Sequence, residues 1–227
     1  IGETKPMSSE MSDYAERRRI MVDTQVRPSD VTKYPIIDAM LSVPREAFVP
    51  GGRREAAYVG ENMTLAPQRV MLEPRTFAKM LDALEIGPGD LVLDIGAGLG
   101  YSSAILSRLA EAVIALEEDS HFASEAQTAL AEQAADNVVV VEGPLAEGAA
   151  KHGPYDVILV EGAAEALPEA IAAQLAAGKQ SLYLDLDNAI CIGLLPDIPR
   201  EVFDVIGNGS LAGAFLEGKW LALMQEE

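Results

Sequence analysis

The stretch Asp94-Ile95-Gly96-Ala97-Gly98-Leu99-Gly100 is the most informative part of this chain for its fold class. It follows the apolar run 91–93 and leads into the segment 101–106, whose apolar residues recur at helical spacing. A strand, a glycine-rich turn and a helix in this order are typical of a nucleotide-binding loop. The dinucleotide-binding fingerprint would place its third glycine at position 101, where this chain has Tyr101. The loop therefore points to a nucleotide-type cofactor other than a dinucleotide.

An acidic residue, Asp94, precedes the first glycine of the loop by two positions. A carboxylate there would repel a phosphate group, but it would attract an ammonium group such as the one at the methionine end of S-adenosylmethionine. The sequence therefore predicts a cofactor site at Asp94, Gly96, Ala97, Gly98 and Gly100. The alternative is a tight turn between strand and helix whose glycines serve packing only.

A second apolar run, 112–116, ends in the acidic trio Glu117-Glu118-Asp119. An acid at the end of the second strand, about twenty residues after the first glycine, can accept hydrogen bonds from both ribose hydroxyls of a nucleotide. We assign this role to Glu117, the first of the three. The trio could instead cap the next helix, and the two roles are compatible, with Asp119 or Ser120 as the cap.

Apolar segments and turn residues predict an alternation of strands and helices downstream of position 90. The expected strands are 91–95, 112–117, 138–141, 155–160 and 180–186, and the expected helices are 100–110, 120–134 and 165–177. This alternation predicts an α/β fold, a doubly wound and mainly parallel sheet. Three further runs could be strands: 189–195, 202–206 and 220–224.

Upstream of this core, helices are expected over 13–25, 36–41 and 76–84, and residues 57–74 are expected to be a loop. We divide the chain into three parts: residues 1–6, which resemble sequence left over from cloning, an N-terminal helical extension with a substrate loop over 7–75, and the core over 76–227.

The charge of the chain is −19, and it is distributed unevenly. Residues 1–90 hold 12 Lys and Arg against 14 Asp and Glu, whereas residues 91–227 hold 5 against 22, which gives −2 and −17. A surface this acidic disfavours a nucleic-acid partner. No apolar run is long enough to span a membrane, so we expect no membrane partner. The oligomeric state is open.

The chain has one cysteine, Cys191, and two histidines. A single cysteine cannot form an internal disulfide, which suits a reducing compartment, so a cytoplasmic location is expected. These few residues form no ligand cluster in the sequence, so we predict no metal site.

Four features follow one another along the chain: Gln25-Val26-Arg27, then Val43-Pro44-Arg45-Glu46-Ala47-Phe48-Val49-Pro50, then the glycine loop with Glu117, and then Pro154-Tyr155-Asp156-Val157-Ile158-Leu159-Val160. In these features, from about Arg19 to Gln174, the chain resembles the protein-L-isoaspartate O-methyltransferases. It implies a seven-stranded methyltransferase fold with an antiparallel last strand, S-adenosylmethionine as methyl donor, and a protein or peptide substrate. The free carboxylate of an isoaspartyl residue in damaged protein would be the methyl acceptor.

The substrate side of the chain departs from the pattern of this family. The family's loop usually reads Gln-Thr-Ile-Ser-Gln-Pro, and the matching stretch here is Arg69-Val70-Met71-Leu72-Glu73-Pro74, so Leu72 stands where the family has a serine. The resemblance places the adenine at Pro144 and Leu145, where Pro144 cannot accept a hydrogen bond as the family's aspartate does. Glu161 replaces the usual threonine after the fourth strand.

Methyl transfer to a carboxylate needs no general base, because the carboxylate is already ionised at neutral pH. Proximity and alignment then supply most of the catalysis, roughly 7–11 kcal/mol in favourable systems. Arg69, Arg75 or Lys79 could hold the acceptor carboxylate by charge-assisted hydrogen bonds, or they could be a solvated surface cluster. A methyltransferase with another acceptor and a non-catalytic binding module are the alternative functions.

Overall fold

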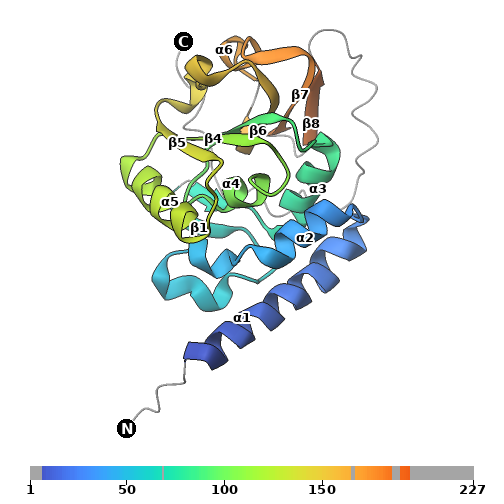
Figure 1. Ribbon diagram of the computed structural model, residues 1–227, viewed down its shortest axis with the longest axis vertical. Helices are drawn as coiled ribbons and strands as arrows, with labels where there is room; N and C mark the ends of the chain where they lie inside the picture. Colours follow the sequence, from blue (N-terminus) through green and yellow to red (C-terminus); the bar gives the residue numbers. More distant parts are fainter. Residues whose placement is uncertain (1–6, 68, 165–166, 186–189, 195–227) are drawn as a thin grey trace.

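The computed structural model describes residues 7–67, 69–164, 167–185 and 190–194 (Figure 1). The α-helices are α1 (Met7–Met21), α2 (Tyr34–Ser42), α3 (Pro74–Leu84), α4 (Tyr101–Leu106), α5 (Ser120–Glu132) and α6 (Glu169–Ala172). The shorter helical turns are η1 (Val22–Val26), η2 (Arg27–Ser29), η3 (Arg45–Phe48), η4 (Gly51–Ala56), η5 (Leu145–Glu147) and η6 (Ala150–His152). The strands are β1 (Met63–Ala66), β2 (Arg69–Met71), β3 (Leu91–Ile95), β4 (Ala112–Glu117), β5 (Val138–Glu142), β6 (Tyr155–Ala164), β7 (Leu175–Asp185) and β8 (Ile190–Leu194).

One sheet holds six strands of the described residues, in the order β5-β4-β3-β6-β7-β8. Strands β3 to β7 pair in parallel, and β8 is antiparallel to β7. The predicted α/β fold with a mainly parallel sheet is therefore confirmed, including the candidate strand at 189–195. The resemblance implied seven strands, which the described residues do not show, because the candidates 202–206 and 220–224 lie outside them.

The helix expected over 165–177 is wrong for most of its length. Its only helical turn in the described residues is α6, and β7 already begins at Leu175. Leu175 pairs in register with Tyr155 of β6, and the Tyr155 N–H donates to the Gln174 carbonyl at 2.8 Å. The alanine-rich composition favours a helix, but pairing with a strand of the core overrides that weak preference.

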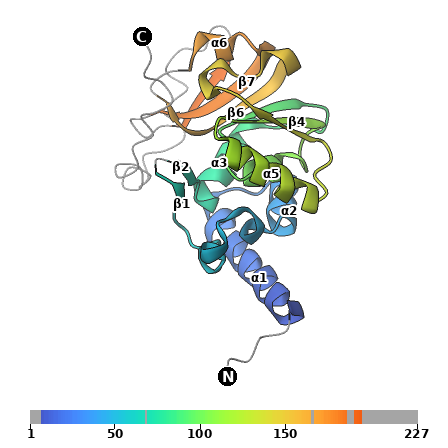
Figure 2. The same ribbon diagram turned by 90° about the vertical axis from the view of Figure 1, so that its left-hand side faces the viewer.

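Residues 57–74, expected to be a loop, contain a hairpin formed by β1 and β2, in which Thr64 pairs with Val70. The two strands are four and three residues long, too short for an alternating pattern to reveal them. The hairpin lies beside α3 in Figure 2. The part of the chain called a helical extension therefore also carries a small sheet.

The expected helices of the extension are present, and their apolar faces join one core with the α/β part. Helix α3 shows why, since Phe77, Met80, Leu81 and Leu84 recur at helical spacing and are all buried. Figures 1 and 2 both place α1 at the opposite end of the molecule from α6. Leu65 and Met71 of the hairpin line a cavity together with the glycine loop, so the hairpin lies at the carboxyl end of β3.

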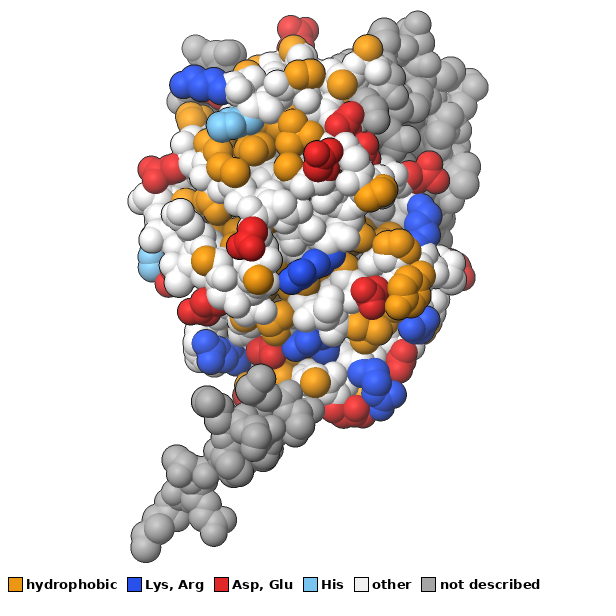
Figure 3. All heavy atoms as spheres, in the orientation of Figure 1, with side chains coloured by type: hydrophobic (Ala, Val, Ile, Leu, Met, Phe, Trp, Pro, Cys, Tyr) orange, Lys and Arg blue, Asp and Glu red, His pale blue; other side chains and the backbone are white. Residues whose placement is uncertain are grey.

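The face shown in Figure 3 carries charges of both signs, and its Lys and Arg side chains gather mainly in the lower half. That half holds the N-terminal extension, which agrees with the uneven charge of the sequence. The described part of the chain contains no helix that could span a membrane.

Candidate active site

The order of the sheet strands places the candidate site between β3 and β6. Chain connections run outward in opposite directions from these two neighbours, so their carboxyl ends form the switch point at which open α/β sheets bind ligands. Ile95 pairs with Leu116 of β4 and with Val160 of β6. The start of the glycine loop, Glu117 and Glu161 therefore lie side by side at the carboxyl ends of the strands.

The glycine loop adopts a backbone that requires glycine. Gly96, Gly98 and Gly100 have φ angles of 80°, 56° and 92°, in the region that side chains with a Cβ rarely adopt. The N–H groups of Gly96 and Ala97 both donate to the carbonyl of Leu116, at 2.9 and 3.2 Å. The loop is thereby fixed to the end of β4, and a Cβ at Gly98 or at Gly100 would come within 3.1 Å of Leu65 or 3.2 Å of Ala126.

Asp94 is fully buried under the glycine loop. The hydroxyls of Ser102 and Ser103 donate to its Oδ2 at 2.7 and 2.5 Å, whereas its Oδ1 has no hydrogen-bond partner among the described residues. Burial raises the pKa of Asp94 to about 6, and the nearby charge of Glu117 adds to the rise, while the two serines oppose it. A buried carboxylate oxygen without a partner is suited to receive a cationic or hydrogen-bonding ligand.

The raised pKa of Asp94 predicts that the contribution of this group to the stability of the free protein is lost as the pH rises. The folded state holds the proton up to about pH 6, whereas the unfolded chain releases it near the ordinary aspartate pKa of 3.8, so the contribution is complete below 3.8 and is lost as the pH rises through about 6. The loss for this group is about 3 kcal/mol. We expect Asp94→Asn to flatten this part of the pH dependence of urea unfolding. An equally steep loss in the variant would contradict this assignment.

Glu117 lies at the end of β4 and is also fully buried. The N–H groups of Gly98 and Asp119 donate to its carboxylate at 2.8 and 3.0 Å. Arg69 of the hairpin forms a two-pronged ion pair with the same carboxylate, with Nη1 2.7 Å from Oε1 and Nη2 contacting Oε2. The Arg69 guanidinium also lies over the ring of Phe122, 5.3 Å from its centre. Arg69, predicted as a substrate-loop residue, and Glu117, predicted as a cofactor residue, thus form an ion pair with each other.

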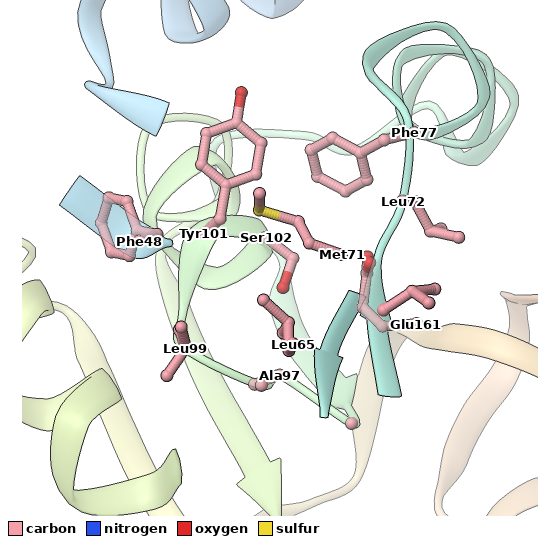
Figure 4. A pocket seen from close by; sticks show the side chains of 13 residues that line it. Phe48, Leu65, Met71, Leu72, Phe77, Ala97, Leu99, Tyr101, Ser102 and Glu161 are labelled. Carbon is pink, nitrogen blue, oxygen red and sulfur yellow. The ribbon is translucent and has the colours of Figure 1, made fainter. Parts of the chain in front are cut away.

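A small cavity of about 20 Å³ lies between the glycine loop and the hairpin. Figure 4 shows side chains of η3, the hairpin, α3, α4 and β6 around it. The lining includes Leu65, Met71, Leu72, Tyr101 and Glu161. A cavity of this size holds about one water molecule, so the hairpin closes the site in this conformation.

A larger groove of about 710 Å³ lies between η4, the hairpin and α5. Leu65 and Leu99 border both this groove and the small cavity. The groove carries Asp119, Glu125 and Glu132 from the α5 side. The two leucines therefore separate the cavity at the glycine loop from a groove on the surface.

Arg45 is a residue of this region for which the sequence reasoning assigned no role. It is 1% exposed, and it donates from Nε to the Ala57 carbonyl at 2.8 Å and from Nη2 to the Leu72 carbonyl at 2.7 Å. Its guanidinium lies 4.7 Å from the centre of the Tyr101 ring. Arg45 thus holds the backbone of the substrate loop against the extension. The available signal was its position next to Glu46 in the segment 43–50, whose other residues are apolar.

The family model of protein-L-isoaspartate(D-aspartate) O-methyltransferases matches residues 17–183 of this chain. The chain belongs to this family. A protein-L-isoaspartate O-methyltransferase of Koribacter versatilis is 34% identical over 171 residues, which cover 75% of this chain and 77% of that relative. One from Methylorubrum extorquens is 37% identical over 175 residues, covering 77% of this chain and 76% of that relative.

Solved structures of the family share the fold. A protein-L-isoaspartate O-methyltransferase superposes with a TM-score of 0.65 at 23% identity, covering 78% of this chain and 57% of that chain. A putative protein-L-isoaspartate O-methyltransferase of Plasmodium falciparum, solved with S-adenosyl-L-homocysteine, gives a TM-score of 0.65 at 17% identity. It covers 82% of this chain and 95% of the other. The resemblance drawn from the sequence is therefore confirmed.

Other predicted residues of this O-methyltransferase family member lie in different settings. Leu72 is 1% exposed and lines the small cavity, whereas Arg75 is exposed and Lys79 is half-buried, and neither lines it. Leu145 is buried close to Gly96, and Pro144 is exposed at the start of η5. Of the candidate substrate-loop residues, Leu72 thus lines the small cavity, whereas Arg69 pairs with Glu117.

Proposed function

We propose that this protein is an S-adenosylmethionine-dependent O-methyltransferase that methylates the free carboxylate of isoaspartyl residues in damaged proteins. The observation that carries the proposal is the buried pair of carboxylates, Asp94 and Glu117, on either side of the glycine loop at the switch point. Membership of the protein-L-isoaspartate(D-aspartate) O-methyltransferase family supports the choice of donor and acceptor. A cytoplasmic location stays a prediction from the single cysteine.

The side chains around the glycine loop have the chemistry needed to bind S-adenosylmethionine. The Oδ1 atom of Asp94, which has no hydrogen-bond partner among the described residues, can hold the ammonium group of the donor. Glu117 can accept hydrogen bonds from the ribose of the donor. We expect Leu145 and Pro144 to flank the adenine, as the family resemblance implies, and neither side chain can accept a hydrogen bond from its amine. Because Arg69 covers Glu117 and the cavity is small, binding requires the β1–β2 hairpin to shift.

The donor supplies a methyl group on a positively charged sulfur, which a carboxylate can take by direct displacement. The chain contributes position and the exclusion of water rather than a base. Arg45 fixes the Leu72 backbone at one wall, and Tyr101 and Phe77 close the apolar side of the cavity. The groove beyond Leu65 and Leu99 offers room for polypeptide beside the acceptor residue.

The direct test combines binding and turnover. Calorimetry with S-adenosyl-L-homocysteine tests the cofactor site, and transfer of labelled methyl to a short isoaspartyl peptide tests the acceptor. The same peptide with normal aspartate is the control. Binding without methylation of the isoaspartyl peptide would reject the proposed acceptor, and failure to bind would reject the cofactor assignment.

Replacing Leu72 by Ser is expected to raise the turnover of the isoaspartyl peptide about tenfold, because a hydroxyl at this wall adds one hydrogen bond to a charged acceptor. In the wild-type protein we expect turnover slower than about 1 per second, below ordinary enzyme rates. Initial rates of labelled methyl transfer measure both, with Leu72→Ala as the control for the change in volume. Fast wild-type turnover, or equal rates in the serine and alanine variants, would refute this role.

A methyltransferase with a different acceptor is the second candidate function. It is favoured by the apolar Leu72 and by Glu161, whose ionised form would repel a carboxylate. Methylation of small amines or alcohols together with inactivity toward the isoaspartyl peptide would select this candidate.

A further inference from the structure

Glu161 occupies the switch point itself. Val160 pairs with Ile95, so the next residue of β6 lies beside the start of the glycine loop. A Cβ built on Gly96 would lie 3.9 Å from the Glu161 Cβ, which shows how closely the two backbones approach. Glu161 is 8% exposed and lines the small cavity together with Leu72, as Figure 4 shows.

The carboxyl group of Glu161 has an oxygen, Oε1, with no hydrogen-bond partner among the described residues. The charged groups that face it are Asp94 from β3 and Arg45 from η3. Asp94 is itself an acid, and Arg45 forms no ion pair with Glu161 within the described part of the chain. A buried carboxylate without a partner is costly, whereas the neutral acid is tolerated and carries a hydrogen-bond donor.

Leu72 borders the same cavity but has no polar group on its side chain. The usual hydroxyl donor of the family's substrate loop is therefore absent here, and a carboxylic acid lies on another wall of the cavity. We propose that the acid of Glu161 donates a hydrogen bond to the carboxylate that becomes methylated, and so positions it. This proposal rests on the proposed isoaspartyl methyltransferase function.

In the methyl transfer, Glu161 donates a hydrogen bond and keeps its proton. One oxygen of the acceptor carboxylate accepts the hydrogen bond, and the other forms the new bond to the methyl carbon. The carbon–sulfur bond of the donor breaks with its electron pair going to sulfur, so a neutral thioether and a neutral methyl ester result. Only the protonated acid can serve, because an ionised Glu161 accepts hydrogen bonds and repels the substrate.

This role predicts a pH dependence that belongs to Glu161. Burial, first, and the charge of Asp94, second, raise the pKa of Glu161 well above its ordinary value, while the charge of Arg45 opposes the rise. Activity should therefore fall as the pH rises through the pKa of Glu161. A glutamine at this position donates from its amide at every pH and should lack that fall.

The experiment compares Glu161→Gln, Glu161→Ala and the wild-type protein with a short isoaspartyl peptide at saturating S-adenosylmethionine. Asp136→Asn, a change at an exposed site far along the chain from the cavity residues, is the control. We expect Glu161→Ala to raise the KM for the peptide at least about tenfold. We expect Glu161→Gln to keep a KM near the wild-type value at low pH and to lack the decrease in activity at high pH.

A second readout does not depend on turnover. Carbon-13 spectra of the glutamate carboxyl groups, with the Glu161 signal identified by its loss in Glu161→Gln, follow its ionisation directly. We expect this signal to titrate well above the other glutamates and to shift when the peptide is added. An ordinary titration, an unchanged KM in Glu161→Ala, or the same alkaline fall in Glu161→Gln would overturn the role of Glu161. Absence of wild-type turnover despite normal cofactor binding would instead reject the proposed function, and this role with it.

Discussion

Replacing Gly98 by Val is expected to abolish binding of S-adenosyl-L-homocysteine, with at least about a hundredfold loss of affinity. Gly98 has a φ of 56°, which a β-branched residue adopts only with strain, and its new Cβ would lie 3.1 Å from the Leu65 Cδ1. Relief of that strain moves the loop, and with it the Gly98 N–H that donates to Glu117. Calorimetry measures the loss.

Gly89→Val is the matched control for this variant. A Cβ at Gly89 meets nothing within 4 Å, and the residue lies in the turn before the same strand, β3. We expect it to leave the affinity within about twofold of the wild-type value. Circular dichroism of both variants verifies that the fold is retained. Near-normal affinity in Gly98→Val would show that the glycine loop does not hold the ligand.

Replacing Arg69 by Met is expected to lower the free energy of unfolding by about 3 kcal/mol or more, because it leaves the buried carboxylate of Glu117 without its cation. The Gly98 and Asp119 N–H groups remain as partners and limit the loss. The same variant should bind S-adenosyl-L-homocysteine about tenfold more tightly, since no ion pair must open to free Glu117. Urea unfolding and calorimetry measure the two effects.

Arg75→Met is the control for Arg69→Met, because it removes the same charge from an exposed position close by in the chain. We expect a change of at most about 0.5 kcal/mol in that variant. Unchanged stability in Arg69→Met would mean that the ion pair contributes nothing. Weaker ligand binding would mean that Arg69 contacts the ligand rather than competing with it.

The local geometry of the candidate cofactor site could be predicted from the sequence because neighbouring residues determine it. A strand, a turn that needs positive φ at Gly96 and Gly98, and a helix form one continuous segment. Asp119 as the cap of α5 is equally local, since its side chain accepts from the N–H groups of His121 and Phe122. The start of α5 and the acidic residue Glu117 at the end of β4 could therefore both be predicted from the same short stretch of sequence.

The structure overturned predictions where distant pairing competes with local preference. The alanine-rich segment 165–177 has helical composition, yet β7 begins within it because Leu175 pairs with Tyr155. The hairpin of β1 and β2 escaped detection because two strands of so few residues leave no periodic signal. Neither case could be decided from propensity, which is weaker than the burial of a strand in the core.

The family and the α/β fold could be inferred from the sequence, because periodicity, turn residues and motif spacing are encoded within short stretches of chain. The packing of distant segments was needed to show that Arg69 pairs with Glu117, 48 residues away, that Arg45 holds the backbone of Leu72, and that Glu161 shares a cavity with Leu72. These contacts join segments that the sequence separates. They depend on how the hairpin, the extension and the sheet edge pack, and that packing is fixed by the summed burial of many side chains rather than by any local pattern.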